Sequence, residues 1–230
     1  MYFYHHEAIW QRFPHLQALV MVLENVRSSI GKTPDLTATL ATVSTVLAQT
    51  SESELPSIRA WRQVYTAMGL KPTQYRCAAE ALLRRYRKEQ QLPQLHPLVD
   101  ALNAESMYAA IPIAAFDCQH IAEGIIVREA TGTENYLSFQ GETEQPAAGE
   151  IIFADAVEQA HARRWVFRQS ALSAVSAESD TVLLVAEAMH EDAGNDLHRL
   201  QQRILARAEE LGITVRQTAI LCAQQKRFDF

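Results

Sequence analysis

The sequence predicts an α+β fold with layered β-sheets and helices packed on them, and three observations support this expectation. Segments with helical periodicity lie mostly in the first half of the 230-residue chain, whereas short apolar runs typical of strands lie mostly in the second half. This grouping favours an α+β fold over alternating βαβ units. Neither an internal repeat nor a low-complexity linker divides the chain, so we expect residues 1–230 to form a single domain with a helix-rich N-terminal half.

Helices are expected where apolar residues recur at spacings of three and four. Along the chain, these segments are residues 33–50, 51–70, 75–91, 92–107 and 196–211. In the second segment, Ile58, Trp61 and Tyr65 have this spacing, and Gly69 is a natural C-terminal stop. The last segment is stopped in the same way by Gly212.

The third of these helices has a charged face. Glu80 lies four residues from both Arg76 and Arg84, and pairing at this spacing supports a helix. The pattern places these charged residues on the solvent side, opposite Leu82 and Tyr86.

Strands are expected where short apolar runs are bounded by proline, glycine or polar residues. These runs are residues 16–22, 111–117, 124–130, 150–155, 181–189 and 213–222. Between them, residues 131–149 are polar and contain glycine, which indicates hairpins or a protruding arm. Alternation along the fifth strand puts Glu187 on the same face as Leu183 and Val185, where its carboxyl group would be partly buried. The alternative is that Glu187 lies at the end of the strand and its side chain reaches solvent.

The composition is that of a folded protein of the cytoplasm. The chain is 48% hydrophobic and 21% charged, which excludes disorder. Its longest apolar stretch, LQALVMVL, is too short for the roughly 20 residues that cross a bilayer, and the N-terminus lacks the pattern of a secretory signal. Three cysteines lie far apart with no C-x-x-C, which favours a reducing compartment. We therefore expect a cytoplasmic protein that does not enter a membrane.

Positive charge is concentrated in one segment. Between Arg59 and Lys88 there are eight basic residues and a single acid, Glu80, although the whole chain carries a net charge of −6. Such a segment can attract phosphate, because salt limits the reach of the distant acidic residues. The alternative is an ordinary solvated helix face. The candidate RNA-binding residues are Arg76, Arg84, Arg85, Arg87, Lys88 and Arg164.

Short catalytic and cofactor motifs are absent. SSIGKT resembles the end of a phosphate-binding loop, but Val26 stands where that motif requires its first glycine. The sequence contains no G-x-S-x-G, no G-x-G-x-x-G and no H-E-x-x-H. We therefore expect no metal and no cofactor.

A longer series of motifs runs through the middle of the chain. In order, these are AWRQVYTAMGLKPTQYRCAAEALLRR, PLVDALNAES, IPIAAFD, GEIIFAD and RRWVFRQS. Together they resemble the free-standing form of the B3/B4 tRNA-editing domain, a module of the β-subunit of bacterial phenylalanyl-tRNA synthetase. The resemblance covers about residues 59–188, and we expect residues 1–58 and 189–230 to be extensions packed on this core.

The resemblance implies a trans-acting deacylase that hydrolyses the ester of mischarged aminoacyl-tRNA without a metal. Asn103 and Asp117 match family positions, and Glu187 falls near the carboxylate that recognises the tyrosine hydroxyl in the synthetase. These three are the candidate catalytic residues. Ala114 stands where the family has a pocket histidine, so either a histidine-assisted reaction is not available or another group replaces the histidine.

The stretch RRWVFRQS completes the expected substrate pocket. The candidate substrate-binding residues are Ala114, Trp165, Arg168, Gln169 and Ser170. In one interpretation, the arginines contact the terminal phosphates of tRNA and an aromatic ring stacks on a base or on the amino-acid side chain.

The alternative interpretation of the same stretch is structural. Arg164 and Arg168 would pair with Asp155 or Glu150, and Trp165 would lie in the core. Both interpretations place the stretch on a strand with two alternating faces.

Three functions remain open at this point. The first is the trans-editing deacylase, and the second is a non-catalytic module that binds tRNA or another RNA. The third is a protein that binds an amino-acid-like small molecule in the same pocket. Turnover distinguishes the first from the second, and a steep salt dependence of affinity distinguishes both from the third.

Overall fold

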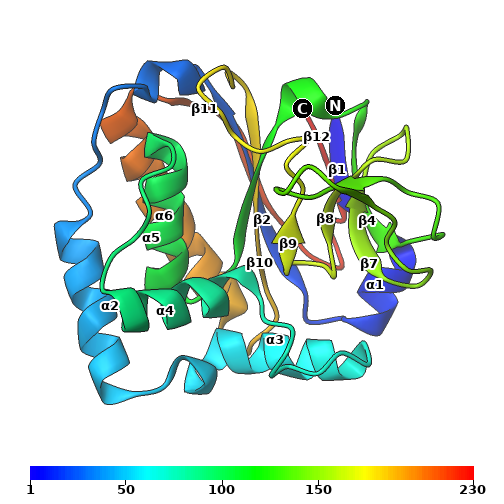
Figure 1. The fold of residues 1–230 in the computed structure, drawn as a ribbon, viewed down its shortest axis with the longest axis horizontal. Helices are drawn as coiled ribbons and strands as arrows, with labels where there is room; N and C mark the ends of the chain where they lie inside the picture. The colour runs from blue at the N-terminus through cyan, green and yellow to red at the C-terminus, as the bar shows by residue number, and fades with distance from the viewer.

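The computed structural model describes residues 1–230 and confirms the predicted α+β class (Figure 1). The α-helices are α1 (Glu7–Arg12), α2 (Thr37–Gln49), α3 (Pro56–Ala67), α4 (Ala78–Glu89), α5 (Pro97–Ala109) and α6 (Ala193–Leu211). Short 3₁₀ helices are η1 (Val26–Ser29), η2 (Glu52–Glu54) and η3 (Cys118–His120). None of the helices has both the length and the apolar composition needed to cross a membrane.

The strands form two sheets and a small hairpin. The strands are β1 (Tyr2–His5), β2 (Gln17–Glu24), β3 (Ile113–Asp117), β4 (Gly124–Glu129), β5 (Tyr136–Leu137), β6 (Thr143–Glu144), β7 (Ile151–Ala154), β8 (Ala160–Arg163), β9 (Arg168–Gln169), β10 (Val182–Ala188), β11 (Thr214–Leu221) and β12 (Arg227–Asp229). One sheet has the order β12-β1-β4-β7-β8-β9, the other has the order β11-β2-β10-β3, and β5 pairs with β6. The β5–β6 pair agrees with the hairpin expected over residues 131–149.

The four-stranded sheet stands between a layer of helices and the six-stranded sheet (Figure 1). On β2, Leu19 and Met21 pack with Leu200 of α6, whereas Val20 and Val22 belong to the core that faces the six-stranded sheet. Because β2 and β10 are covered on both faces, their sequences are continuous apolar runs rather than alternating ones.

Two strands from outside residues 59–188, β1 and β12, complete the six-stranded sheet. β1 pairs in parallel with β4, placing Phe3 opposite Ile125, and it pairs antiparallel with β12 near the C-terminus. Every other strand pair in the two sheets is antiparallel. The N- and C-termini therefore lie side by side (Figure 1).

The prediction that Glu80 lies on a solvated face of α4 is wrong. The buried stripe of α4 contains Leu83 and Tyr86, and Glu80 is completely buried with them. The carboxylate is tolerated there because Arg62 of α3 donates to it at 2.7 Å, with Arg76 at 3.6 Å. Burial raises the pKa of Glu80, although the two arginines act to lower it.

Candidate functional site

The stretch RRWVFRQS forms a hairpin and not the predicted alternating strand. β8 ends at Arg163, β9 begins at Arg168, and the two residues are paired across the turn between them. The chain reverses because Arg164 and Trp165 have left-handed backbones, with φ of 47° and 59°. Each such residue costs about 1 kcal/mol or more without glycine, so the surroundings must hold the turn in place.

The turn is held by contacts to both backbone and side chains. The backbone N–H of Trp165 donates to the carbonyl of Ile151 at 2.7 Å, and that of Arg164 donates to Glu150 Oε1 at 3.0 Å. The indole Nε1 of Trp165 donates to Glu187 Oε1 at 2.9 Å. These bonds turn the indole into the core, where Trp165 is completely buried, as the structural interpretation predicted.

The arginines of this hairpin have different partners. Arg163, which is buried, forms ion pairs with Glu144 and with Glu150, the latter at 2.9 Å. The guanidinium carbon of Arg164 lies 4.9 Å from the ring centroid of Tyr75, and its Nε forms a long ion pair of 3.9 Å with Glu150 Oε2.

Arg168 is the exception among the hairpin arginines. It is exposed, lies over the ring of Phe167 at 5.3 Å, and has no carboxylate within 4.0 Å. Neither Arg164 nor Arg168 pairs with Asp155. Arg168 is therefore the one arginine of the hairpin that is free to receive an anion.

Beneath the hairpin is a small cavity of about 60 Å³, here named the inner cavity. It is lined by Ala114 of β3 together with Trp165, Phe167, Arg168 and Gln169. Trp165 forms one wall, and its indole fills space that a smaller residue would leave open. Four of the predicted substrate-binding residues, Ala114, Trp165, Arg168 and Gln169, thus meet at one place.

A larger cavity of about 340 Å³, here named the outer cavity, adjoins it. Asn103 of α5 and Gln169 supply its side-chain amides, and the rest of the lining is largely hydrophobic. Gln169 lines both cavities and donates from Nε2 to the carbonyl of Ala115 at 2.6 Å, which ties β9 to β3. The two cavities together are named the β3–β9 site.

The rim of the outer cavity contains two residues that sequence reasoning missed. Leu95 is 67% exposed and Phe139 is 66% exposed, which is unusual for large apolar side chains. Phe139 lies in the polar segment 131–149, and an aromatic residue in such a segment is a sequence signal that could have identified it as a site residue. No comparable pattern marks Leu95.

Asp117 and Ser170 lie outside both cavities. Asp117 is buried and accepts from the backbone of Gln119 at 3.0 Å and from Ser179 Oγ at 2.6 Å. Ser170, also buried, donates to the carbonyl of Leu137 at 2.9 Å and has no imidazole or carboxylate partner. Their hydrogen bonds connect loops around the site.

Glu187 lies behind the inner cavity and does not line it. As predicted, it is on the face of β10 that contains Leu183 and Val185, and its side chain is only 1% exposed. His5 Nε2 lies 2.6 Å from Glu187 Oε1, which also accepts from Trp165. Glu187 thus reaches the site only through the indole of Trp165.

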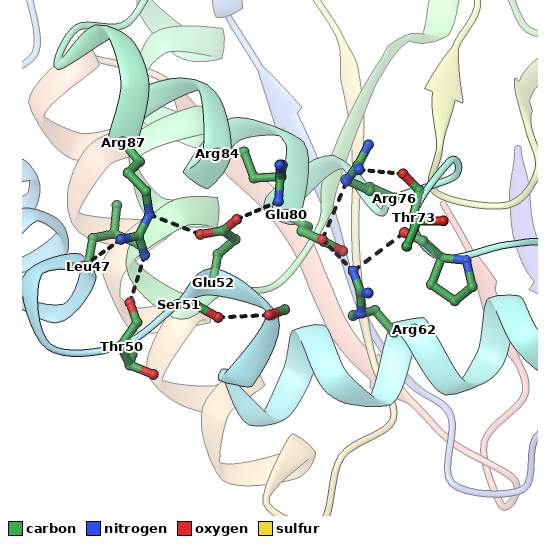
Figure 2. Close-up of polar contacts among 12 residues, drawn as sticks. Leu47, Thr50, Ser51, Glu52, Arg62, Thr73, Arg76, Glu80, Arg84 and Arg87 are labelled. Carbon is green, nitrogen blue, oxygen red and sulfur yellow. Dashed lines mark hydrogen bonds and ion pairs between the residues drawn. The ribbon is translucent and has the colours of Figure 1, made fainter.

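Five of the eight basic residues of the segment 59–88 form ion pairs, and Figure 2 shows those made by Glu52 and Glu80. Glu52 accepts from Arg84 at 2.9 Å and from Arg87 at 3.0 Å, while Glu80 lies between Arg62 and Arg76. Outside the figure, Arg85 pairs with Glu89 at 2.8 Å, whereas Lys88 is exposed and has no ion-pair partner. The structure therefore leaves Lys88 and Arg168 as unpaired cations among the predicted phosphate contacts.

The fold and the site define an α+β domain with two adjoining cavities at the junction of its two sheets. Residues 60–210 match the family model of the B3/4 domain. The chain belongs to the B3/4 domain family, which confirms the resemblance of its motifs.

One solved structure with a similar fold is an N-terminal fragment of the phenylalanyl-tRNA synthetase β-subunit from Pyrococcus horikoshii. The two share 9% sequence identity with a TM-score of 0.51, over 93% of this chain and 49% of that one. The likeness is one of fold, and the chain spans about half the length of the fragment. No curated protein matches the sequence.

Proposed function

We propose that this protein hydrolyses the ester bond of mischarged aminoacyl-tRNA at the β3–β9 site. The observation that supports this most is the adjoining pair of cavities that share Gln169, with the unpaired Arg168 at their edge. An aminoacyl-tRNA presents an amino-acid side chain, a reactive ester carbonyl and a terminal nucleotide. The two cavities and the exposed arginine offer a place for each.

The inner cavity would receive the amino-acid side chain. Its volume of about 60 Å³ is small beside the roughly 150 Å³ of a cavity that holds benzene. Trp165 sets this limit, so the site favours small side chains. Ala114, which stands where the family has a histidine, offers this side chain an apolar contact.

The outer cavity would receive the terminal nucleoside. Phe139 and Leu95 present apolar surface on which an unpaired base can stack, and stacking of this kind tolerates any base. Arg168 lines the inner cavity, next to the outer one, and its guanidinium can bind a phosphate oxygen of the nucleotide.

The chemistry would rest on positioning. Neither cavity has a carboxylate or an imidazole in its lining, so the site offers no general base. Asn103 makes no side-chain hydrogen bond within the protein, and the side-chain Oε1 of Gln169 accepts none, so these amides can orient a water and the ester carbonyl. An activated ester requires little more than this and stabilisation of the oxyanion.

The test is deacylation of a panel of correctly and incorrectly charged tRNAs at catalytic protein concentration. We expect multiple turnovers on tRNAs that carry a small, wrong amino acid. Asn103→Ala and Gln169→Ala should each lower kcat/KM at least tenfold. Arg216→Ala, on the distant strand β11, serves as the matched surface control. Absence of turnover on every ester would overturn the proposal.

A second candidate function is binding of tRNA without turnover. It is favoured by Ala114 at the family's histidine position and by the engagement of Asp117 and Glu187 in hydrogen bonds outside the cavities. Retained binding of uncharged tRNA without hydrolysis of any ester would support this function instead.

A further inference from the structure

A third cavity lies in the helical layer, away from the β3–β9 site. It measures about 210 Å³ and is lined by residues of α2, α3, α4 and α5 together with His190 and Asp196. We name it the helical cavity. Thirteen residues line it, eight of them hydrophobic, and none of them lines the inner or outer cavity. Its lining comes from the helical layer and the segment that follows β10, whereas the β8–β9 hairpin belongs to the six-stranded sheet.

Two buried polar atoms in this lining have no hydrogen-bond partner. Ser57 is 3% exposed and its Oγ is unpaired. The side chain of His190 is 6% exposed and its Nδ1 is unpaired, although its Nε2 is 2.7 Å from Asp196 Oδ2. Buried hydroxyl and imidazole groups normally find partners, because leaving them unpaired costs stability. Two such atoms in the lining of one cavity indicate a polar group of a ligand.

The pairing with Asp196 determines what His190 offers. A carboxylate only accepts, so Nε2 of His190 carries the hydrogen and donates it. In the neutral ring, Nδ1 is then an acceptor. Ser57 Oγ both donates and accepts, and it lies in the first turn of α3, whose N-terminus no side chain caps. A ligand hydroxyl, which also donates and accepts, complements this pair, whereas a carboxylate has no hydrogen to give to Nδ1.

The rest of the cavity suits a small aromatic body. An apolar cavity of about 150 Å³ holds benzene, so about 210 Å³ is enough for a substituted ring. Leu83 and Met107 are buried in the wall, and the partly exposed Val46 and Tyr108 line it as well. We propose that the helical cavity binds a small aromatic alcohol, with its ring against the apolar wall and its hydroxyl between Ser57 and His190.

The test uses three probes of one shape with the full-length protein. These are 4-methylphenol, toluene and 4-methylbenzoate, which differ only in the group that would meet Ser57 and His190. Binding is followed by NMR of the methionine methyl groups, because Met107 lines the cavity and Met189 does not. We expect 4-methylphenol to shift the Met107 signal saturably and to bind at least tenfold more tightly than toluene. We expect 4-methylbenzoate not to bind.

Two variants separate the polar contacts from the cavity itself. Ser57→Ala removes an unpaired hydroxyl, so the variant should fold normally. Its affinity for 4-methylphenol should lie within threefold of its affinity for toluene. In Asp196→Asn, the side-chain amide donates to Nε2 of His190, so the ring hydrogen moves to Nδ1. This change should weaken the binding of 4-methylphenol relative to that of toluene. Equal affinity for 4-methylphenol and toluene, no shift of Met107, or an unchanged preference in Ser57→Ala would each overturn the proposal. Ester hydrolysis is independent of it, since Ser57 lines only the helical cavity.

Discussion

The indole of Trp165 and the carboxylate of Glu187 are joined by a hydrogen bond of 2.9 Å from Nε1 to Oε1, with both side chains buried. Trp165 forms a wall of the inner cavity, whereas Glu187 lies behind it on β10. The same oxygen is 2.6 Å from His5 Nε2 of β1. One carboxylate thus joins the hairpin to both sheets and determines where the cavity wall stands.

Removing this carboxylate should destabilise the fold. Glu187→Ala leaves the buried Nε1 of Trp165 and the ring of His5 without their acceptor, and we expect a loss of about 3 kcal/mol in the free energy of unfolding. Glu187→Gln keeps an acceptor for Trp165, so its free energy of unfolding should fall less than that of Glu187→Ala. Urea denaturation measures both, with the exposed Glu191→Ala as control. A Glu187→Ala protein as stable as that control would contradict this role.

Shortening the wall should broaden the choice of amino acid. Trp165→Phe keeps an aromatic ring but removes Nε1 and part of the volume, so the inner cavity grows. We expect hydrolysis of esters of larger amino acids to rise relative to esters of small ones, at a stability cost of about 2 kcal/mol. The ratio of kcat/KM values across the tRNA panel measures the shift. An unchanged ratio would exclude Trp165 as the limit on side-chain size.

The pH dependence of hydrolysis should lack the bend that a catalytic base produces. No group with an ordinary pKa between 5 and 8 lines the inner or outer cavity, so we expect hydroxide, held by the amides of the site, to be the nucleophile. We expect log kcat/KM to rise with a slope of about 1 from pH 6 to 8. A plateau within this range, with the protein still folded, would reveal a base that the cavities do not contain.

Salt should affect tRNA binding through the few unpaired cations. Lys88→Ala and Arg168→Ala should each lower the slope of log affinity against log salt by about 1, whereas Arg84→Ala should change it less, because Arg84 is paired with Glu52. Conversely, Glu52→Gln releases Arg84 and Arg87 and should steepen the slope. Filter binding of uncharged tRNA at several salt concentrations gives these slopes. Equal effects of Arg84→Ala and Lys88→Ala would contradict the shielding by Glu52.

Glu134 should make stability depend on pH in acid. Burial acts to raise the pKa of Glu134, but hydrogen bonds from the Thr131 backbone and from Arg128 outweigh this effect and lower the pKa to about 2. A lowered pKa means that Glu134 stabilises the fold above its unfolded pKa of about 4.3, and that this contribution is lost as pH falls toward 2.

The matching variant is Glu134→Gln. Its free energy of unfolding should be about 2 kcal/mol lower than that of the parent protein at pH 7, and this difference should shrink as the pH approaches 2. Thermal unfolding between pH 2 and 7 follows this difference. A difference that does not vary with pH would show that the charge of Glu134 is not the cause.

Local patterns were sufficient for most of the elements. The apolar runs of β2 and β10 and the stop of α6 at Gly212 depend on residues close in the chain, and the structure agrees with the predictions there. The phase of α4 was misjudged, because a charged residue normally faces water. Glu80 is buried only because Arg62, from another helix, reaches it.

The sequence by itself determined the class of fold and the family, and it singled out five of the residues that meet at the β3–β9 site, Asn103, Ala114, Trp165, Arg168 and Gln169. Motif order and apolar periodicity are properties of neighbouring residues. Only the tertiary structure decided that Arg168 has no ion-pair partner while Arg84 and Arg87 both pair with Glu52, and that Glu187 lies behind Trp165 and accepts its hydrogen bond. The physical reason is that ion pairs and buried hydrogen bonds join residues far apart in the chain. Their partners are fixed by packing, which no local pattern contains.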